Sequence, residues 1–376
     1  MKQSWLVLLT CLSACGSDGS SSDVDAGGGS GTTDGSVSPT VDSSVDCSSA
    51  TAQMDKAVCQ AQGFLGTLSA TELTTANPAM TDTTARTKWS NLPTGMVARG
   101  GIKMGSLSTN SQAAALELMK TVLSADGYSD LDGIRAADSY LGTMQGGYGA
   151  DLYYVAIFGT PSATGQWEVM FGGHHMAFNI VYSGGEAHPT PNHQGAEPKA
   201  PFTLNGTTYA PVQGEGAAMQ AIFTSLDSTQ LASAYLSGQT FGDVLIGPVE
   251  YGTGSSTAAK NKFPTGTNRK GVLVSSLSAD QQALVTASIA QWVGDYDTDT
   301  ATRLMTAYTG AYSDTYVAWA GTQSAGVDVD KNGTYMRIDG PRAWIEIACQ
   351  GGIVIQGVTH YHMIYRDKSD DYAGTL

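Results

Sequence analysis

The chain has 376 residues and a formal net charge of −15, with 34 Asp and Glu against 19 Lys and Arg. A chain this acidic repels a phosphate backbone, so we exclude nucleic acid as a partner. Beyond the N-terminal residues, no run approaches the roughly 18 apolar residues that a membrane-spanning helix needs. We therefore expect no further membrane span.

The N-terminus has the pattern of a bacterial export signal. Lys2 supplies a positive charge, and the apolar run Trp5 to Leu12 is too short to stay in the membrane as a helix. The run leads into Leu12-Ser13-Ala14-Cys15, which resembles the lipobox of bacterial lipoproteins. The resemblance implies that acyl chains on Cys15 anchor the protein to a membrane. Gly16 after the cysteine implies the outer membrane; ordinary secretion with a free thiol is the alternative.

Composition divides the rest of the chain. After a signal peptide of residues 1–14, residues 15–46 consist almost wholly of Ser, Gly, Asp, Thr and Val. Such a segment cannot bury enough apolar surface to offset the entropy lost on ordering. We expect it to be a solvated, disordered tether.

Cysteine spacing predicts one disulfide. Cys47 and Cys59 are close in sequence and belong to an exported chain, which favours a bond between them. They lie in an N-terminal extension over residues 47–84, ahead of a globular domain over residues 85–376. Cys349 is left over inside an apolar run, where we expect a buried thiol rather than a nucleophile.

Hydrophobic periodicity predicts helices and strands in mixed order. Helical period is present at residues 111–124, 216–226, 228–236, 279–293 and 298–308. Ser108 and Ser278 precede two of these segments as N-caps. Strand-like runs occupy residues 152–158, 167–171, 175–182, 335–338, 344–349 and 353–365. Because strands and helices do not alternate regularly, the predicted class is α+β.

The chain also contains a faint internal repeat. Residues 99–108 and 269–278 share arginine, glycine and Ser-Leu-Ser at one spacing, and residues 154–160 are similar to residues 316–322. Either a duplication has produced two pseudo-symmetric halves, or chance has produced the similarity in a chain rich in Gly, Ser and Ala. Ligand sites often lie between such halves.

Histidines are the main candidates for metal binding. His360 and His362 lie two apart in a strand-like run, so their side chains point to one face, where they suit zinc, copper or iron. A hydrogen-bonded pair without metal is the alternative. In a strand, His174 and His175 face opposite ways, and His175 shares its face with Asn179. We expect His175 to be a third metal ligand. We expect His174 and Asn179 to contact the ligands without binding the metal themselves.

Glu346 lies in an apolar run, where a carboxylate is costly unless it is paired or bound to a cation. One interpretation is that Glu346 forms an ion pair with Arg342. The other is that Glu346 is a metal ligand, or a general acid or base with a raised pKa. Arg342 or Arg366 would then stabilise developing negative charge. Asp367 would accept a hydrogen bond from an imidazole and orient it.

A second cation motif is weaker. Asp328, Asp330, Asn332, Gly333 and Asp339 have the spacing of a calcium loop. The flanking sequence does not predict the two helices of such a site, and a turn rich in Asp, Asn and Gly explains the same residues. The sequence favours the turn.

Several motifs together resemble domain-of-unknown-function family 3500, over about residues 89–374. They are Trp89 with Arg99-Gly100-Gly101, Phe158-Gly159-Thr160-Pro161, Trp167 with Gly173-His174-His175, Gly195-Ala196-Glu197-Pro198, Arg337-Ile338-Asp339-Gly340-Pro341 with Glu346, His360-Tyr361-His362, Arg366-Asp367 and Asp371-Tyr372-Ala373-Gly374. The resemblance implies that these groups belong to one family signature, and it implies no activity. His193 stands where the family has an aromatic residue, so we leave it out of the site.

Two functional hypotheses follow. In the first, the protein is a metal-dependent enzyme, a hydrolase by preference: His175, His360 and His362 hold zinc, copper or iron, and Glu346 activates water against an unknown small-molecule substrate. In the second, it is a non-catalytic extracytoplasmic protein that binds a small molecule, metal or saccharide through Trp and Tyr residues. A purely structural lipoprotein ranks third. The first hypothesis requires remote imidazoles to converge beside a carboxylate.

Overall fold

A computed structural model describes residues 46–248 and 254–376. The predicted signal peptide, the lipidation site at Cys15 and the tether before residue 46 lie outside these residues. The described part begins with the extension, whose helices are α1 (Gln53–Gly66), α2 (Ala70–Ala76) and α3 (Thr83–Arg86). The predicted Cys47–Cys59 disulfide is confirmed. Among the described residues, each helix is too short or too polar to cross a bilayer.

One large antiparallel sheet organises the fold. Its strands are β1 (Ile102–Lys103), β2 (Tyr154–Gly159), β3 (Trp167–Gly173), β4 (Met176–Ser183), β5 (Glu186–His188), β6 (Asn192–Ala196), β9 (Val272–Leu273), β10 (Tyr316–Ala320), β11 (Tyr335–Asp339), β12 (Ala343–Gly351) and β13 (Thr359–Asp367). The order is β1-β2-β3-β4-β6-β13-β12-β11-β10-β9, with β5 beside β4. A separate hairpin joins β7 (Phe202–Leu204) to β8 (Thr207–Tyr209).

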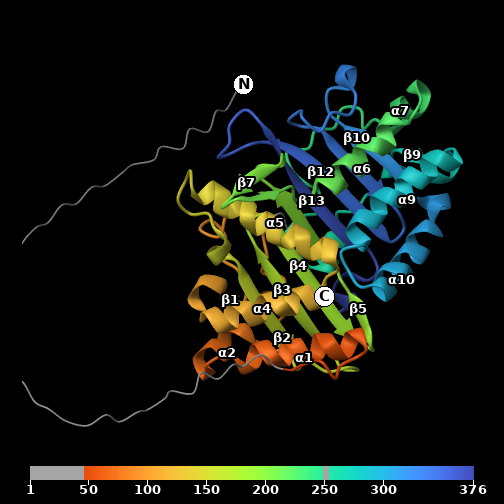
Figure 1. Cartoon of the computed structure of the whole chain (residues 1–376). Helices are drawn as coiled ribbons and strands as arrows, with labels where there is room; N and C mark the ends of the chain where they lie inside the picture. Colours follow the sequence, from red (N-terminus) through yellow and green to blue (C-terminus); the bar gives the residue numbers. More distant parts are fainter. Residues whose placement is uncertain (1–45, 249–253) are drawn as a thin grey trace, which may run out of the picture. The chain divides into compact units, whose positions relative to one another are not determined.

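The two faces of the sheet are covered differently. The longer helices lie over one face (Figure 1): α4 (Thr109–Val122), α5 (Ala125–Gly142), α6 (Gln213–Thr224), α9 (Ala279–Val293) and α10 (Thr298–Thr309). Their apolar sides and the facing strand residues form the main core. The other face packs against residues from mostly irregular segments, 84–100, 236–248 and 254–263. The last of these contains α8 (Ser256–Lys260), and α7 (Ser228–Ala234) precedes the second. The predicted α+β class is confirmed.

Most predicted elements are present, with ends shifted by a few residues. Helix α5 and strand β6 were not predicted. The predicted strand at 353–365 is wrong in its first half, because β12 pairs with β13 so that Gly351 lies opposite Thr359. The residues between them must turn, and Ile353 is 67 % exposed. Cys349 is buried and free, as expected.

The two halves of the chain repeat one order of elements. Each half has a two-residue strand, a 3₁₀ turn, two long helices and three antiparallel strands: β1, η1 (Met104–Ser106), α4, α5 and β2–β4 in the first, and β9, η5 (Val274–Ser276), α9, α10 and β10–β12 in the second. Ser108 caps α4 and Ser278 caps α9 through the backbone N–H three residues on. This order is what a duplication would produce, and the duplication itself stays a prediction.

Two glycines at equivalent positions of the halves provide a stability test. Gly101 has φ +84° and Gly271 has φ +135°, and an added Cβ would lie 2.4 Å from Val155 O and 2.5 Å from Val317 O, respectively. In Gly271→Ala, the positive φ would strain the alanine backbone and the added Cβ would clash with Val317 O. Together these effects should lower the free energy of unfolding by about 3 kcal/mol. Chemical denaturation measures the change. Gly66→Ala, where an added Cβ meets nothing within 4 Å, is the control; equal midpoints for both variants would contradict the prediction.

Candidate metal centre

Strand β13 brings two histidines to the centre of the sheet, beside β6. His360 and His362 project to the face away from the long helices, because the alternate residues Tyr361 and Met363 pack in the core under those helices. His175 enters from the turn between β3 and β4. Gly195 lies opposite His362 in the β6–β13 register, and a Cβ there would contact the Cβ of His175. The contact with His175 is an ordinary one, and glycine is required at position 195 because an added Cβ would lie 2.3 Å from Tyr361 O.

The three imidazoles meet in one buried cluster. The His175 ring centroid is 5.1 Å from that of His360 and 5.0 Å from that of His362. His360 Nε2 lies 3.2 Å from His362 Nε2. One nitrogen from each ring lies within 4.8 Å of the other two. Two nitrogens bound tetrahedrally at about 2.1 Å from one ion would be roughly 3.4 Å apart, so this spacing fits a shared metal.

The electrostatics of the cluster favour uncharged rings. Burial lowers the pKa of His175 well below its usual value, and the neighbouring imidazoles, His174 first, lower it further. Burial, followed by the effect of His362, lowers the pKa of His360 to about 3. His360 Nδ1 has no hydrogen-bond partner among the described residues. These two rings are therefore neutral at pH 7, which is the state that ligates metal.

Two segments on this face support the cluster through polar contacts. His362 Nδ1 lies 2.9 Å from Asp243 Oδ1 and 3.0 Å from Asn91 Nδ2. The backbone carbonyl of Asn91 also accepts a hydrogen bond from the backbone N–H of His175, at 3.0 Å. The Asp243 carboxylate favours the tautomer whose lone pair is on Nε2, the nitrogen that faces His360, whereas the Asn91 amide nitrogen, which can only donate, favours the opposite tautomer. The charge-assisted contact with Asp243 is the stronger of the two. Neither Asn91 nor Asp243 was predicted, because each belongs to an irregular segment remote in sequence.

The strand prediction required His174 and His175 to face opposite ways. That prediction is wrong. Both histidines lie in the turn between β3 and β4, and His175 has φ +61°, so strand alternation does not apply to them. The two rings stack, with centroids 3.8 Å apart. His174 Nδ1 also lies 2.7 Å from Asp138 Oδ1 on α5. His174 thus lies next to a predicted ligand, and its supporting role stays a prediction.

His193, which the sequence led us to exclude, lies beside the cluster. It is fully buried on β6, with its ring centroid 5.7 Å from that of His362. Within the described residues, neither ring nitrogen meets the geometry of a hydrogen bond. Burial and then His362 lower its pKa to about 3, although the nearby carbonyl of His175 acts in the opposite direction. Because β6 was not predicted, no sequence pattern placed His193 on this face.

Glu346 lies on the same face but contacts none of the three imidazoles. Its neighbour on β13 is Ile364, two residues beyond His362. Each oxygen accepts two hydrogen bonds; the donors are Leu245 N (2.6 Å), Tyr335 OH (2.7 Å), Ile246 N (3.0 Å) and Trp344 Nε1 (2.5 Å). Burial raises the pKa of Glu346 and these hydrogen bonds lower it. The carboxylate thus holds the segment that carries Asp243.

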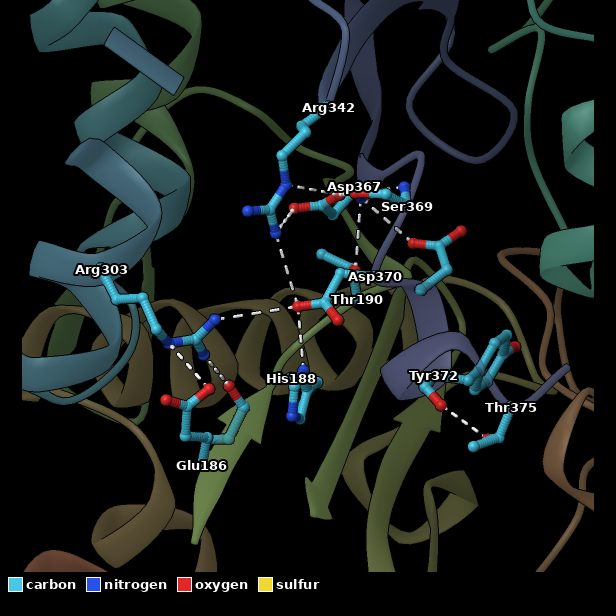
Figure 2. Close-up of polar contacts among 12 residues, drawn as sticks. Glu186, His188, Thr190, Arg303, Arg342, Asp367, Ser369, Asp370, Tyr372 and Thr375 are labelled. Carbon is cyan, nitrogen blue, oxygen red and sulfur yellow. Dashed lines mark hydrogen bonds and ion pairs between the residues drawn. The ribbon is translucent and has the colours of Figure 1, made fainter. Parts of the chain in front are cut away.

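Arg342 and Asp367 belong to a different network, shown in Figure 2. Arg342 Nη2 lies 2.6 Å from Asp367 Oδ2, which also accepts a hydrogen bond from Tyr308 OH on α10 at 3.0 Å. Arg342 thus pairs with Asp367 rather than with Glu346. The structure does not bring Asp367 to the imidazoles, because its position in β13 directs it to the helix-covered face.

Arg366 and Asn179 also lie away from the cluster. Arg366 follows His362 by four strand residues, about 13 Å. It is buried, and it donates hydrogen bonds to Asp371 (2.7 Å) and to the backbone of residues 246–247. Asn179 donates to the carbonyl of Pro191, at 2.9 Å. Of the predicted site, the three metal ligands come together and the charged catalytic groups do not.

The Asp-rich segment forms a turn, as the sequence favoured. Asp328 Oδ1 accepts a hydrogen bond from Asp330 N, and Asp330 pairs with Lys199. Asp339 lies apart from that turn, in β11, where its buried carboxylate contacts Lys368 at 2.5 Å. The five residues with calcium-loop spacing therefore do not surround one point.

Comparisons with known proteins place the chain in a family without an assigned activity. Searches of curated proteins and of solved structures found no match to it. A family profile described as "Protein of unknown function (DUF3500)" matches residues 50–374, so the match begins in the N-terminal extension rather than near Trp89. It includes the three clustered histidines. Since this match covers most of its length, the chain belongs to the DUF3500 family.

Proposed function

We propose that this protein binds a divalent transition metal, zinc, copper or iron, through His175, His360 and His362. One observation carries the proposal. The β3–β4 turn and strand β13 bring three buried imidazoles together, so that one nitrogen of each ring lies within 4.8 Å of a nitrogen of the other two. Soft or borderline divalent metals prefer such nitrogen donors. The Asp243 contact with His362 is the kind of support that imidazole ligands have in metal sites.

We further propose hydrolysis as the reaction class. His175, His360 and His362 would hold the metal, and a metal with three protein ligands would supply Lewis-acid activation of water. Glu346 is committed to four hydrogen bonds, so it is not available as the base, and the proton of such a water would pass to solvent. His193 is buried next to His362, but its pKa of about 3 is too low for a general base at neutral pH, so we assign it no proton-transfer role. The side chain of Asp243 is 22 % exposed, so the contact between Asp243 and His362 is the part of the cluster nearest to solvent.

A non-catalytic ligand-binding role is the second candidate, favoured by a groove at the start of β13. The groove has a volume of about 500 Å³ and is lined by Tyr140, Phe202, Lys199 and Thr359, among others. The Tyr140 and Phe202 rings lie 5.1 Å apart, and aromatic rings of this kind bind sugar or other apolar faces. Thr359 precedes His360 in β13, but strand alternation directs the two side chains to opposite faces, so this groove is separate from the imidazole cluster.

The predicted export signal supports an extracytoplasmic setting for either function. The lipobox-like Leu12-Ser13-Ala14-Cys15 supports anchoring to a bacterial membrane, the outer membrane by preference, through acyl chains on Cys15. The proposed substrate is then a small molecule of the envelope or its surroundings.

Asp243→Asn tests the metal proposal through a residue that is not itself a ligand. Removing the charge that orients His362 should weaken metal affinity by about 10- to 100-fold, because the ring loses its preferred tautomer. Chelator competition with zinc, on protein purified without a polyhistidine tag, measures the affinity. Asp330→Asn, whose side chain is 76 % exposed, should leave it unchanged. If wild-type protein binds none of the three metals, the proposal is wrong.

A further inference from the structure

A second group of potential ligands lies on the opposite face of the sheet, and it is built of oxygen rather than nitrogen. Asp130 on α5, Glu215 on α6 and Asp295 after α9 bring carboxylate oxygens to within 4.8 Å of one another. Glu215 is 3 % exposed and Asp295 is 1 % exposed. One oxygen of Asp130 is fixed by a hydrogen bond from Val212 N, at 2.9 Å.

The surroundings of these carboxylates supply no positive charge. They line a cleft of about 220 Å³, together with a fourth carboxylate, Asp126, and the amides of Gln213 and Gln291. Among the described residues that line the cleft, none is Lys, Arg or His. Burying several carboxylates together is costly unless a cation or protons offset their charge.

An independent observation comes from the strand beneath the cluster. Gln194 on β6 is 1 % exposed, and its Nε2 lies 2.5 Å from Asp295 Oδ2, so its carboxamide is directed at the carboxylates. Its Oε1 is buried and has no hydrogen-bond partner in the described part of the chain. An amide can exchange the positions of its oxygen and nitrogen by turning about its last side-chain bond. That turn would present a neutral oxygen ligand where the nitrogen now lies.

We propose that Asp130, Glu215, Asp295 and the amide oxygen of Gln194 bind a hard divalent cation, of the calcium, magnesium or manganese class. Carboxylate and amide oxygens are the ligands these ions prefer, whereas the imidazole cluster suits softer metals. The two sites are therefore selective for different ions. They share β6, where Gln194 faces this cluster and the preceding His193 faces the imidazoles.

The positions of the ligands indicate what the cation does. Asp130 belongs to the first half of the chain and Asp295 follows a helix of the second half, with Glu215 between them in sequence. An ion held by all three would join these helices over the β6–β13 junction. Binding only to the folded state would then stabilise the protein in proportion to ion concentration.

The test uses the full chain carrying His360→Ala and His362→Ala, so that the imidazole cluster does not contribute. Calorimetric titration with calcium chloride and with manganese chloride should each show about one saturable site per chain, and the melting temperature should rise with ion concentration. Glu215→Gln and Gln194→Ala should weaken binding at least tenfold. Asp132→Asn, on α5 with a half-exposed side chain outside the cluster, should not.

The opposite result is equally specific. If these folded variants and their parent show no saturable binding and no shift in melting temperature, the carboxyl groups hold protons instead and the proposal is overturned. Glu215→Gln is isosteric with the native residue, which preserves folding where Asp295→Asn would perturb the contact with Gln194. Wild-type protein that binds calcium but none of the three transition metals would reject only the proposed function, not this site.

Discussion

His360→Ala should reduce the transition-metal content of the protein from about one equivalent per chain to a trace. With three nitrogen ligands, the loss of one leaves two, and a structural or catalytic site of the zinc type needs at least three protein ligands. His175→Ala should have the same effect, although 185 residues separate the two positions in sequence. Elemental analysis after dialysis, on protein purified without a polyhistidine tag, measures the content.

A histidine outside the cluster supplies the control. His188 lies in the separate polar network of Figure 2, where its Nδ1 contacts Asp370 Oδ2 at 2.9 Å. His188→Ala should keep the full metal content. Metal retained in His175→Ala would show that His360 and His362 bind it without the turn, and the three-ligand site would then be wrong.

Glu346→Ala should lower the free energy of unfolding by about 4 kcal/mol, the largest loss of stability that we expect. The change leaves four donors without an acceptor in a dry part of the molecule, and orphaned buried groups cost about 1–3 kcal/mol each before any relaxation. Urea denaturation measures the loss. Glu117→Ala, on the exposed side of α4, should change stability by less than about 0.5 kcal/mol.

This experiment also decides the role of Glu346. The sequence allowed it to be a metal ligand or a base, and its contacts assign it to holding residues 245–246, next to Asp243. A Glu346→Ala protein of normal stability that lacks metal would restore the ligand role. Lower stability together with a full equivalent of metal would support the structural role.

The sequence was most informative where local geometry alone decides the outcome. Strand alternation placed His360 and His362 on one face, and the serine N-caps at Ser108 and Ser278 were confirmed. Helix α5 escaped prediction because it contains Gly127 and Gly133, which weaken the helical signal. An added Cβ at Gly127 would lie 2.7 Å from Asp295 Cα, so that glycine is required by a contact that the local sequence does not reveal.

The sequence by itself determined the export signal pattern, the α+β class, the Cys47–Cys59 pair and the shared face of the β13 histidines. Only the tertiary structure decided which groups join them. Asn91, Asp243 and His193 reach the site from segments whose pairing depends on the whole sheet, and Glu346 is turned from a candidate catalyst into an anchor by donors 100 and 101 residues away. Side-chain direction along one strand is a local property, whereas its partners depend on packing between remote segments.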